Sequence, residues 1–237
     1  MPLAARELEL PLQPEDLWLA NGNVPAARPF LQGDVFRDTT TNVNGLAVIL
    51  THPCSMRAGY KMRPQQTLAR IEGIKAPATE SQWRSKYLDY MPLPGLSHPS
   101  IGNGYPAADF RLIATVPSSD LRPEDRVAAL SNAGILRLQQ RLAHYMTRVV
   151  IDLPTLSEAC DAVLIEADLQ EEWVEVATRE EELMAGPMLE AEKEFQAFLD
   201  SDNRRLRDKL QEAHTRPDAI REIRMAIRHR GHDERLS

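Results

Sequence analysis

The chain has 237 residues, 43% of them hydrophobic, which is enough for one large domain or two modest ones with a real core. Aromatic residues make up only 5%, which argues against an aromatic stacking surface like that of RRM sheets. No apolar run approaches the length of a membrane span, and residues 1–16 lack the basic start and apolar segment of a signal peptide. We therefore expect a cytoplasmic protein with no membrane partner.

The net charge of −7 is unevenly distributed along the chain. Residues 1–152 carry a net charge of +2, residues 153–202 carry −13, and residues 203–237 carry +4. Blocks of opposite charge are typical of surfaces that pair with each other or with a partner. We expect the acidic segment Glu166–Glu182 to pair with the basic segment Arg204–Arg235 or with a partner helix.

The first 130 residues divide into a proline-rich arm, residues 1–29, and a region of short strands, residues 30–130. Alternating or apolar runs bounded by turn residues predict six strands. They are Gly33–Arg37, Gly45–Thr51, Thr67–Ile74, Tyr87–Pro92, Phe110–Val116 and Arg126–Leu130. Short strands with irregular links favour a small barrel over a parallel sheet, so the expected fold class is α+β.

From Ser131 onward the hydrophobic period becomes helical. Ser131 or Asn132 is placed to cap a helix that runs to about Val150, where Leu153–Pro154 interrupts it. Further amphipathic segments follow to the end of the chain. Residues 131–237 are therefore expected to form an α-helical C-terminal region.

One stretch resembles a known family. Gly33-Asp34-Val35 opens a strand, and after a polar turn the apolar strand Ala47-Val48-Ile49-Leu50 ends at Thr51. This pattern is similar to the opening of PemK/MazF-like proteins over about residues 30–130. The resemblance implies an SH3-like small β-barrel, which in the best-known members is a toxin endoribonuclease. The carboxylate of Asp34 is expected to fix the turn into the first strand rather than to act in catalysis.

The chain departs from that family in two places. The loop Asp38–Asn44 holds no cation, whereas the toxins carry an arginine between the first two strands. The long helical region beyond Ser131 is also foreign to a small toxin of this kind. Both departures favour a barrel that is kept as a binding platform over an active ribonuclease.

The candidate catalytic residues follow the apolar strand at once: Thr51, His52 and Arg57. Cleavage of RNA through the 2′-hydroxyl needs a base, an acid and a cation that stabilises the phosphorane, which this set supplies by residue type. The alternative is a plain turn in which Pro53 fixes the bend. Cys54 and Cys160 form no CxxC pair, and we expect no metal and no cofactor.

A nucleic-acid-binding role is predicted for five arginines, because guanidinium groups suit phosphate recognition. They are Arg37, Arg57, Arg137, Arg141 and Arg148. The last three lie on one face of the first long helix by spacing. A solvated face, or pairing with the acidic segment, is the alternative for that helix.

We therefore expect a non-catalytic accessory component of a bacterial multi-protein system, related to phage defence or to toxin–antitoxin pairs. It would bind a protein partner through the helical region, and RNA or DNA through the barrel. A metal-independent endoribonuclease of PemK/MazF type is the alternative. A DNA-binding regulator is disfavoured by the acidic net charge and by the lack of a helix-turn-helix pattern.

Overall fold

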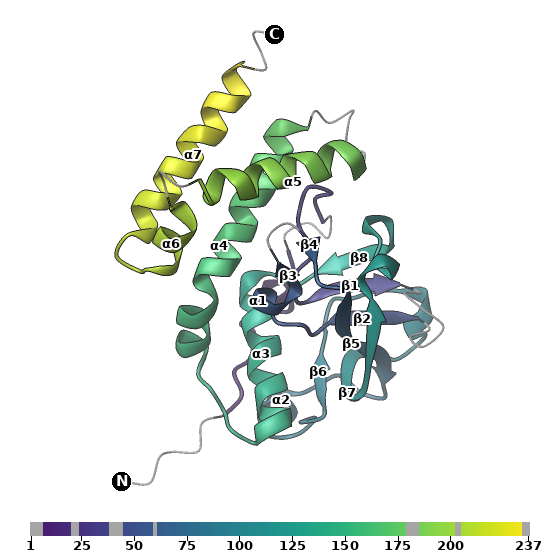
Figure 1. Ribbon diagram of the computed structural model, residues 1–237. Coiled ribbons are helices and arrows are strands. Elements are labelled where there is room, and N and C mark those ends of the chain that lie inside the picture. Colours follow the sequence, from purple (N-terminus) through teal and green to yellow (C-terminus); the bar gives the residue numbers. More distant parts are fainter. Residues whose placement is uncertain are drawn as a thin grey trace, which may run out of the picture. The chain divides into compact units, whose positions relative to one another are not determined.

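The computed structural model describes residues 7–19, 24–37, 45–58, 61–178, 185–201 and 205–233. The chain contains both helices and strands: an antiparallel sheet is followed by C-terminal helices (Figure 1). At this level the predicted α+β class is confirmed. The loop Asp38–Asn44, which lacks the arginine that the toxins carry, lies outside the described residues.

The strands are β1 (Asp34–Arg37), β2 (Leu46–Ile49), β3 (Arg57–Ala58), β4 (Lys61–Met62), β5 (Gln65–Ile74), β6 (Tyr90–Pro92), β7 (Tyr105–Pro117) and β8 (Arg126–Ala129). The helices are α1 (Pro53–Met56), α2 (Glu80–Ser85), α3 (Asn132–Thr147), α4 (Leu153–Ala177), α5 (Ala185–Leu199), α6 (Leu206–Gln211) and α7 (Arg216–Asp233). Short 3-10 turns are η1 (Pro14–Leu17), η3 (Pro99–Ile101), η4 (Ser118–Asp120) and η5 (Pro123–Asp125). None of the helices in the described part of the chain is long and apolar enough to cross a bilayer.

Contacts divide the chain into two compact units. The first holds residues 1–24, 31–56 and 62–159, and the second holds residues 25–30, 57–61 and 160–237. Helix α3 therefore belongs with the sheet, and α4 starts in the first unit and continues in the second. The predicted boundaries at residues 29 and 130 both differ from this division.

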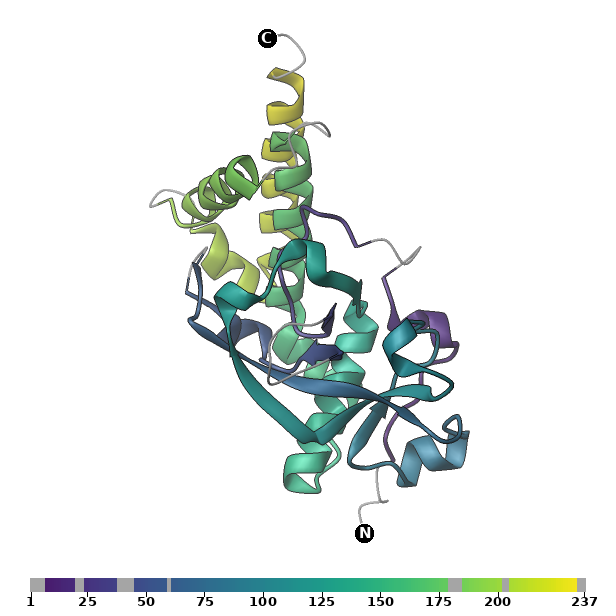
Figure 2. The same ribbon diagram turned by 90° about the vertical axis from the view of Figure 1, so that its right-hand side faces the viewer.

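The main sheet of the first unit has six antiparallel strands in the order β6-β7-β5-β2-β1-β8. Each of the six predicted strands contributes to it. The two longest, β5 and β7, run side by side, drawn in blue and teal (Figure 2). β2 is buried along its whole length, which explains its continuous apolar run, because side chains on both of its faces are covered.

The opening Gly33-Asp34 has a structural role. Gly33 has a φ of +90°, and a Cβ there would lie 2.8 Å from the Cβ of Leu130. The Asp34 carboxylate accepts a hydrogen bond from the Leu31 amide at 3.1 Å, so it fixes the turn as predicted. It also pairs with Arg126 at 3.1 Å, and both side chains are buried.

Helix α3 begins as the sequence predicted. The Gly134 amide donates to the Ser131 hydroxyl at 3.1 Å, which is the expected N-cap. The helix ends at Thr147, three residues before the predicted end, because Arg148 takes a left-handed conformation. Leu153 and Pro154 then form the first turn of α4 and not merely an interruption, since proline suits that position.

The second unit is a helical cluster with its own core. Leu169, Trp173, Phe195, Leu199, Leu206, Leu210, Ala219, Ile223 and Ile227 form this core. Around it, Arg207 pairs with Glu166 at 2.6 Å and Arg224 with Glu172 at 2.7 Å. The predicted pairing of the acidic middle with the basic end of the chain is therefore confirmed for these residues.

Candidate functional site

Thr51, the first predicted catalytic residue, follows β2. Its hydroxyl oxygen accepts a hydrogen bond from the amide of Thr67 at 2.7 Å. The carbonyl of Thr67 in turn accepts from the amides of Leu50 and Thr51, at 2.8 and 3.3 Å. The hydroxyl therefore fastens the end of β2 to β5, which is a structural role.

His52 lies in the turn that enters α1. Its Nδ1 accepts a hydrogen bond from the Cys54 amide at 3.3 Å, and its carbonyl accepts from the Ser55 amide at 2.8 Å. Burial lowers the pKa of His52, which favours the neutral imidazole at pH 7. A neutral imidazole with Nδ1 turned to its own loop matches the plain-turn alternative for this segment.

Arg57, the predicted cation, opens β3 and belongs to the second unit. Its Nη1 lies 4.0 Å from the Glu192 carboxylate. The pKa of Glu192 is raised by burial, and the charge of Arg57 opposes that shift. The guanidinium of Arg57 thus lies next to the half-buried carboxylate of Glu192 and favours its charged form.

Three of the other predicted nucleic-acid contacts have partners within the chain. Arg37 is half exposed and lies 3.5 Å from Asp125. Arg137 donates to the carbonyls of Ala133 and Leu10, at 2.9 and 3.0 Å. Arg148 lies over the ring of Tyr145, with Cζ 6.0 Å from the ring centroid.

Arg141 is a core residue and not a phosphate contact. Only 1% of it is exposed, and its guanidinium donates to the carbonyls of Trp83, Tyr87 and Tyr90 at 2.8 to 2.9 Å. It also lies over the Trp83 ring at 5.1 Å, and burial lowers its pKa to about 10. Helical spacing could place Arg141 on a face but could not show that this face is packed against the sheet. We therefore remove it from the candidate nucleic-acid surface.

The three carbonyls held by Arg141 belong to the segment that leads into β6. Tyr87 has a φ of 53°, a conformation that is uncommon for a residue with a side chain. The predicted strand from Tyr87 therefore begins only at Tyr90, whose amide donates to the Tyr87 carbonyl at 3.0 Å. The rings of Tyr87 and Tyr90 lie 6.2 Å apart at an interplanar angle of 81°.

Tyr90, Asp109 and Arg70 are cross-strand neighbours on β6, β7 and β5, so their side chains share one face of the sheet. On the same face, the Arg111 guanidinium donates to both oxygens of Asp109, at 2.9 and 2.7 Å. It also donates to the Tyr90 hydroxyl and lies over the Tyr90 ring, with Cζ 4.6 Å from the centroid. Although burial alone would raise it, these hydrogen bonds hold the pKa of Asp109 below its usual value.

A hollow of about 350 Å³ lies beside this group. It is lined by Glu72, Gly73, Ile74, Lys75, Tyr87 and Tyr90. The carboxylate of Glu72 lies 3.3 Å from the Nε of Arg70. Tyr105, which is 47% exposed, is the cross-strand neighbour of Ile74 on the same face. We call the group Arg70, Glu72, Lys75, Tyr87, Tyr90, Tyr105 and Arg111 the tyrosine face.

The tyrosine face is richer in aromatic residues than the chain as a whole. Although aromatic residues are few, three of the five tyrosines gather here: Tyr87, Tyr90 and Tyr105. Aromatic rings beside guanidinium groups on a sheet can stack with unpaired bases and contact phosphates. In the sequence, Asp109 and Arg111 alternate on a strand that follows a Tyr-x-x-Tyr turn. The sequence alone could not predict the strand register that places these two residues beside Tyr90.

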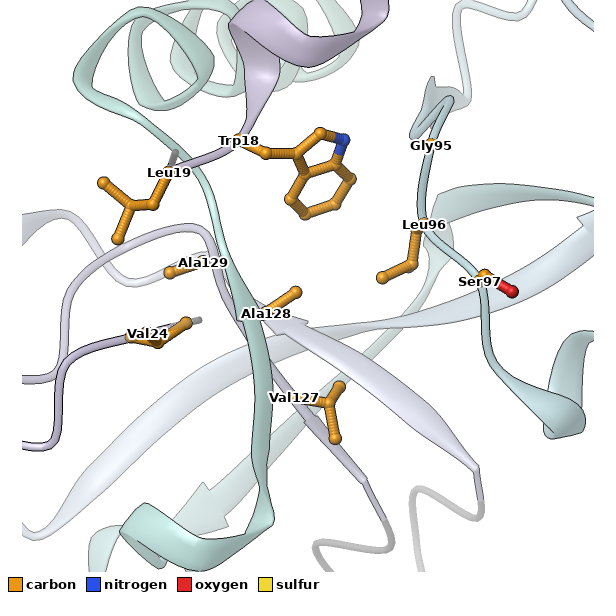
Figure 3. A pocket seen from close by; sticks show the side chains of 9 residues that line it. All are labelled: Trp18, Leu19, Val24, Gly95, Leu96, Ser97, Val127, Ala128 and Ala129. Atoms are coloured by element: carbon orange, nitrogen blue, oxygen red, sulfur yellow. The ribbon is translucent and has the colours of Figure 1, made fainter. Parts of the chain in front are cut away.

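A second hollow of about 230 Å³ lies next to β8 (Figure 3). Its lining side chains are apolar except for the Ser97 hydroxyl and the Trp18 indole nitrogen, and the Trp18 ring forms one wall. The indole nitrogen donates to the Pro94 carbonyl at 2.7 Å, so Trp18 is held against the loop that precedes η3. The lining side chains include no charged group, so this hollow is less suited to polar ligands than the tyrosine face is.

Comparison of the chain with protein-family models, with curated proteins and with solved structures finds no match. Among the described residues, no group of three or more His, Cys, Asp or Glu side chains is arranged to hold a metal ion. Of the two cysteines, Cys54 is exposed and Cys160 is buried.

Proposed function

We propose that this protein is a non-catalytic binding component of a bacterial multi-protein system, of the phage-defence or toxin–antitoxin kind. It contacts single-stranded nucleic acid through the tyrosine face and a protein partner through the helical unit. The observation that supports the binding of nucleic acid is that Tyr90 contacts both Tyr87 and Arg111 beside a hollow on one face of the sheet.

The proposed fold of the first unit is a divergent SH3-like barrel of the PemK/MazF kind. Its support is the antiparallel strand order, in which β1 lies between β2 and β8, together with the Gly33-Asp34 opening. In this proposal the barrel retains the strand arrangement of PemK/MazF-like proteins, and the binding surface lies on β5, β7 and β6. The predicted surface of Arg37, Arg57, Arg137, Arg141 and Arg148 is thereby replaced.

Single strands suit the tyrosine face better than duplexes do. Unpaired bases expose ring faces that can stack on tyrosine, whereas paired bases do not. The acidic net charge of −7 weakens contacts that depend on phosphate charge alone. Stacking on a few fixed rings is less affected by that charge.

The protein partner is proposed to dock on an exposed face of α7. Arg221, Met225 and Arg228 follow each other at intervals of four and three residues, so they share one exposed face of α7. Leu189 on α5 is exposed to a similar degree as Met225, 45% against 47%. A photocrosslinking amino acid at position 225 should capture the partner in cells, whereas one at the exposed Asp208 should not, and equal capture at both would contradict this surface.

The nucleic-acid half is tested by titrating labelled 12-nucleotide RNA and DNA strands, and a 12-base-pair duplex, with fluorescence anisotropy as the readout. We expect the single strands to bind more tightly than the duplex. Removing one stacking ring costs about 1–3 kcal/mol, so Tyr87→Ala should weaken single-strand binding by about 5- to 150-fold. The control variants Thr51→Val and His52→Gln should bind like the wild type.

A strand affinity that depends on Thr51 and His52 but not on Tyr87 would contradict the proposal. It would favour the alternative, an endoribonuclease of PemK/MazF type that uses Thr51, His52 and Arg57. Two observations argue against that alternative. The Thr51 hydroxyl accepts the Thr67 amide, and the Arg57 guanidinium lies beside Glu192.

A further inference from the structure

The hollow on the tyrosine face also has a chemistry that distinguishes between bases. Its lining combines two aromatic rings, one carboxylate and one ammonium group. We infer that this hollow holds one unpaired guanine base, which Glu72 selects, with the attached phosphate near Lys75. This inference rests on the proposed binding of nucleic acid at the same face.

The aromatic wall is fixed before any ligand arrives. Arg111 lies over the Tyr90 ring and is itself held by the buried Asp109 through two hydrogen bonds. Arg141 holds the backbone of Tyr87 and Tyr90 through their carbonyls. Because these rings need little ordering on binding, a stacked base retains more of its interaction energy.

Glu72 supplies the selectivity. It extends from β5 at the edge of the hollow, and Arg70 steadies its carboxylate at 3.3 Å. An ionised carboxylate accepts hydrogen bonds at two oxygens and donates none. Guanine presents two adjacent donors on its Watson–Crick edge, the N1–H and the 2-amino group, which match those two oxygens.

The other bases fit this carboxylate less well. Adenine and cytosine each present one amino donor next to a ring nitrogen acceptor, which a carboxylate repels. Uracil presents a single donor between two carbonyl oxygens. An acceptor that faces another acceptor costs more binding free energy than a contact that is simply absent. The carboxylate therefore favours guanine and also disfavours the other three bases.

Lys75 gives the hollow a place for a phosphate. It is an exposed residue at the end of β5, and its flexible ammonium acts as a point charge toward phosphate oxygens. The same chemistry would accept a guanine within a single strand or a free guanine nucleotide. The experiment separates these two sources.

The test compares 12-nucleotide oligouridine with the same strand carrying one central guanosine or one central adenosine, and also GMP alone. With the wild type we expect guanosine to tighten binding about tenfold over uridine, the discrimination of one good bidentate base contact. Adenosine should give no comparable gain. Glu72→Gln should erase the guanosine preference, and oligouridine should bind this variant at least as tightly as the wild type, because the carboxylate no longer repels the uracil carbonyl oxygens. The matched control Glu15→Gln on η1 should retain the preference.

The outcomes are distinct. GMP that binds as tightly as the guanosine strand, and in a Glu72-dependent way, supports the site with the free nucleotide as its ligand; a strand that binds more tightly supports the strand. Oligouridine binding that needs Tyr87 but shows no guanosine preference overturns this inference and leaves the proposed function standing. A lack of binding of every strand and of GMP overturns both.

Discussion

Replacing Arg141 by methionine is expected to lower the free energy of unfolding by about 3–5 kcal/mol, because one buried and two partly buried carbonyls lose their donor. Methionine approximates the length of the arginine stem, so the loss reflects the hydrogen bonds more than an empty volume. The carbonyls belong to Trp83, Tyr87 and Tyr90. The measurement is urea denaturation followed by circular dichroism.

Arg137→Met is the matched control on the same helix, because Arg137 is half-buried and donates to two carbonyls. We expect it to cost about 1 kcal/mol, in the range of ordinary hydrogen bonds. If Arg141→Met cost no more than Arg137→Met, the assignment of Arg141 to the core would be wrong. A surviving Arg141 variant should also bind single strands more weakly than the wild type, since the Tyr87 turn would relax.

A second large loss of stability is expected when Asp34 is replaced. Its carboxylate pairs with Arg126, and both side chains are about 1–2% exposed. Asp34→Asn keeps the shape and an oxygen for the Leu31 amide but leaves the Arg126 charge buried beside a neutral group. Breaking a buried ion pair in this way costs about 3–5 kcal/mol. Thermal and urea unfolding of the variant measure the loss.

Two further variants make the Asp34 result interpretable. Asp125→Asn disturbs a more exposed pair, with Arg37 at 3.5 Å, and should change stability by no more than about 1 kcal/mol. The double variant Asp34→Asn/Arg126→Met should recover part of the loss, since the buried charge is removed. Equal stability of Asp34→Asn and the wild type would contradict the structural role of the Gly33-Asp34 opening.

Much of the fold was predictable because its signals are local. The continuous apolar run in β2, the Ser131 cap and the change from strand to helix periodicity each lie within a few residues. The turn role of Asp34 was predictable for the same reason, as its amide partner is three residues away.

The candidate site was not predictable, because pairing between strands that are distant in the sequence builds it. Tyr90, Asp109 and Arg70 meet only through the register of three strands that are separated along the chain. Composition counted few aromatic residues but could not show that three of the five tyrosines share a face. In contrast, Thr51, His52 and Arg57 are close in sequence, yet the hydroxyl and the imidazole bond to backbone amides and the guanidinium lies by Glu192.

The central claim is that nucleic acid binds on the tyrosine face and not at the end of β2. Ultraviolet crosslinking of a bound single strand, followed by trypsin digestion and mass spectrometry, tests it most directly. Cleavage after Lys86 and Arg111 releases one peptide, residues 87–111, that carries Tyr87, Tyr90 and Tyr105, while Thr51 and His52 leave in the separate peptide 38–57. The account predicts crosslinks on residues 87–111; crosslinks confined to residues 38–57 would contradict it.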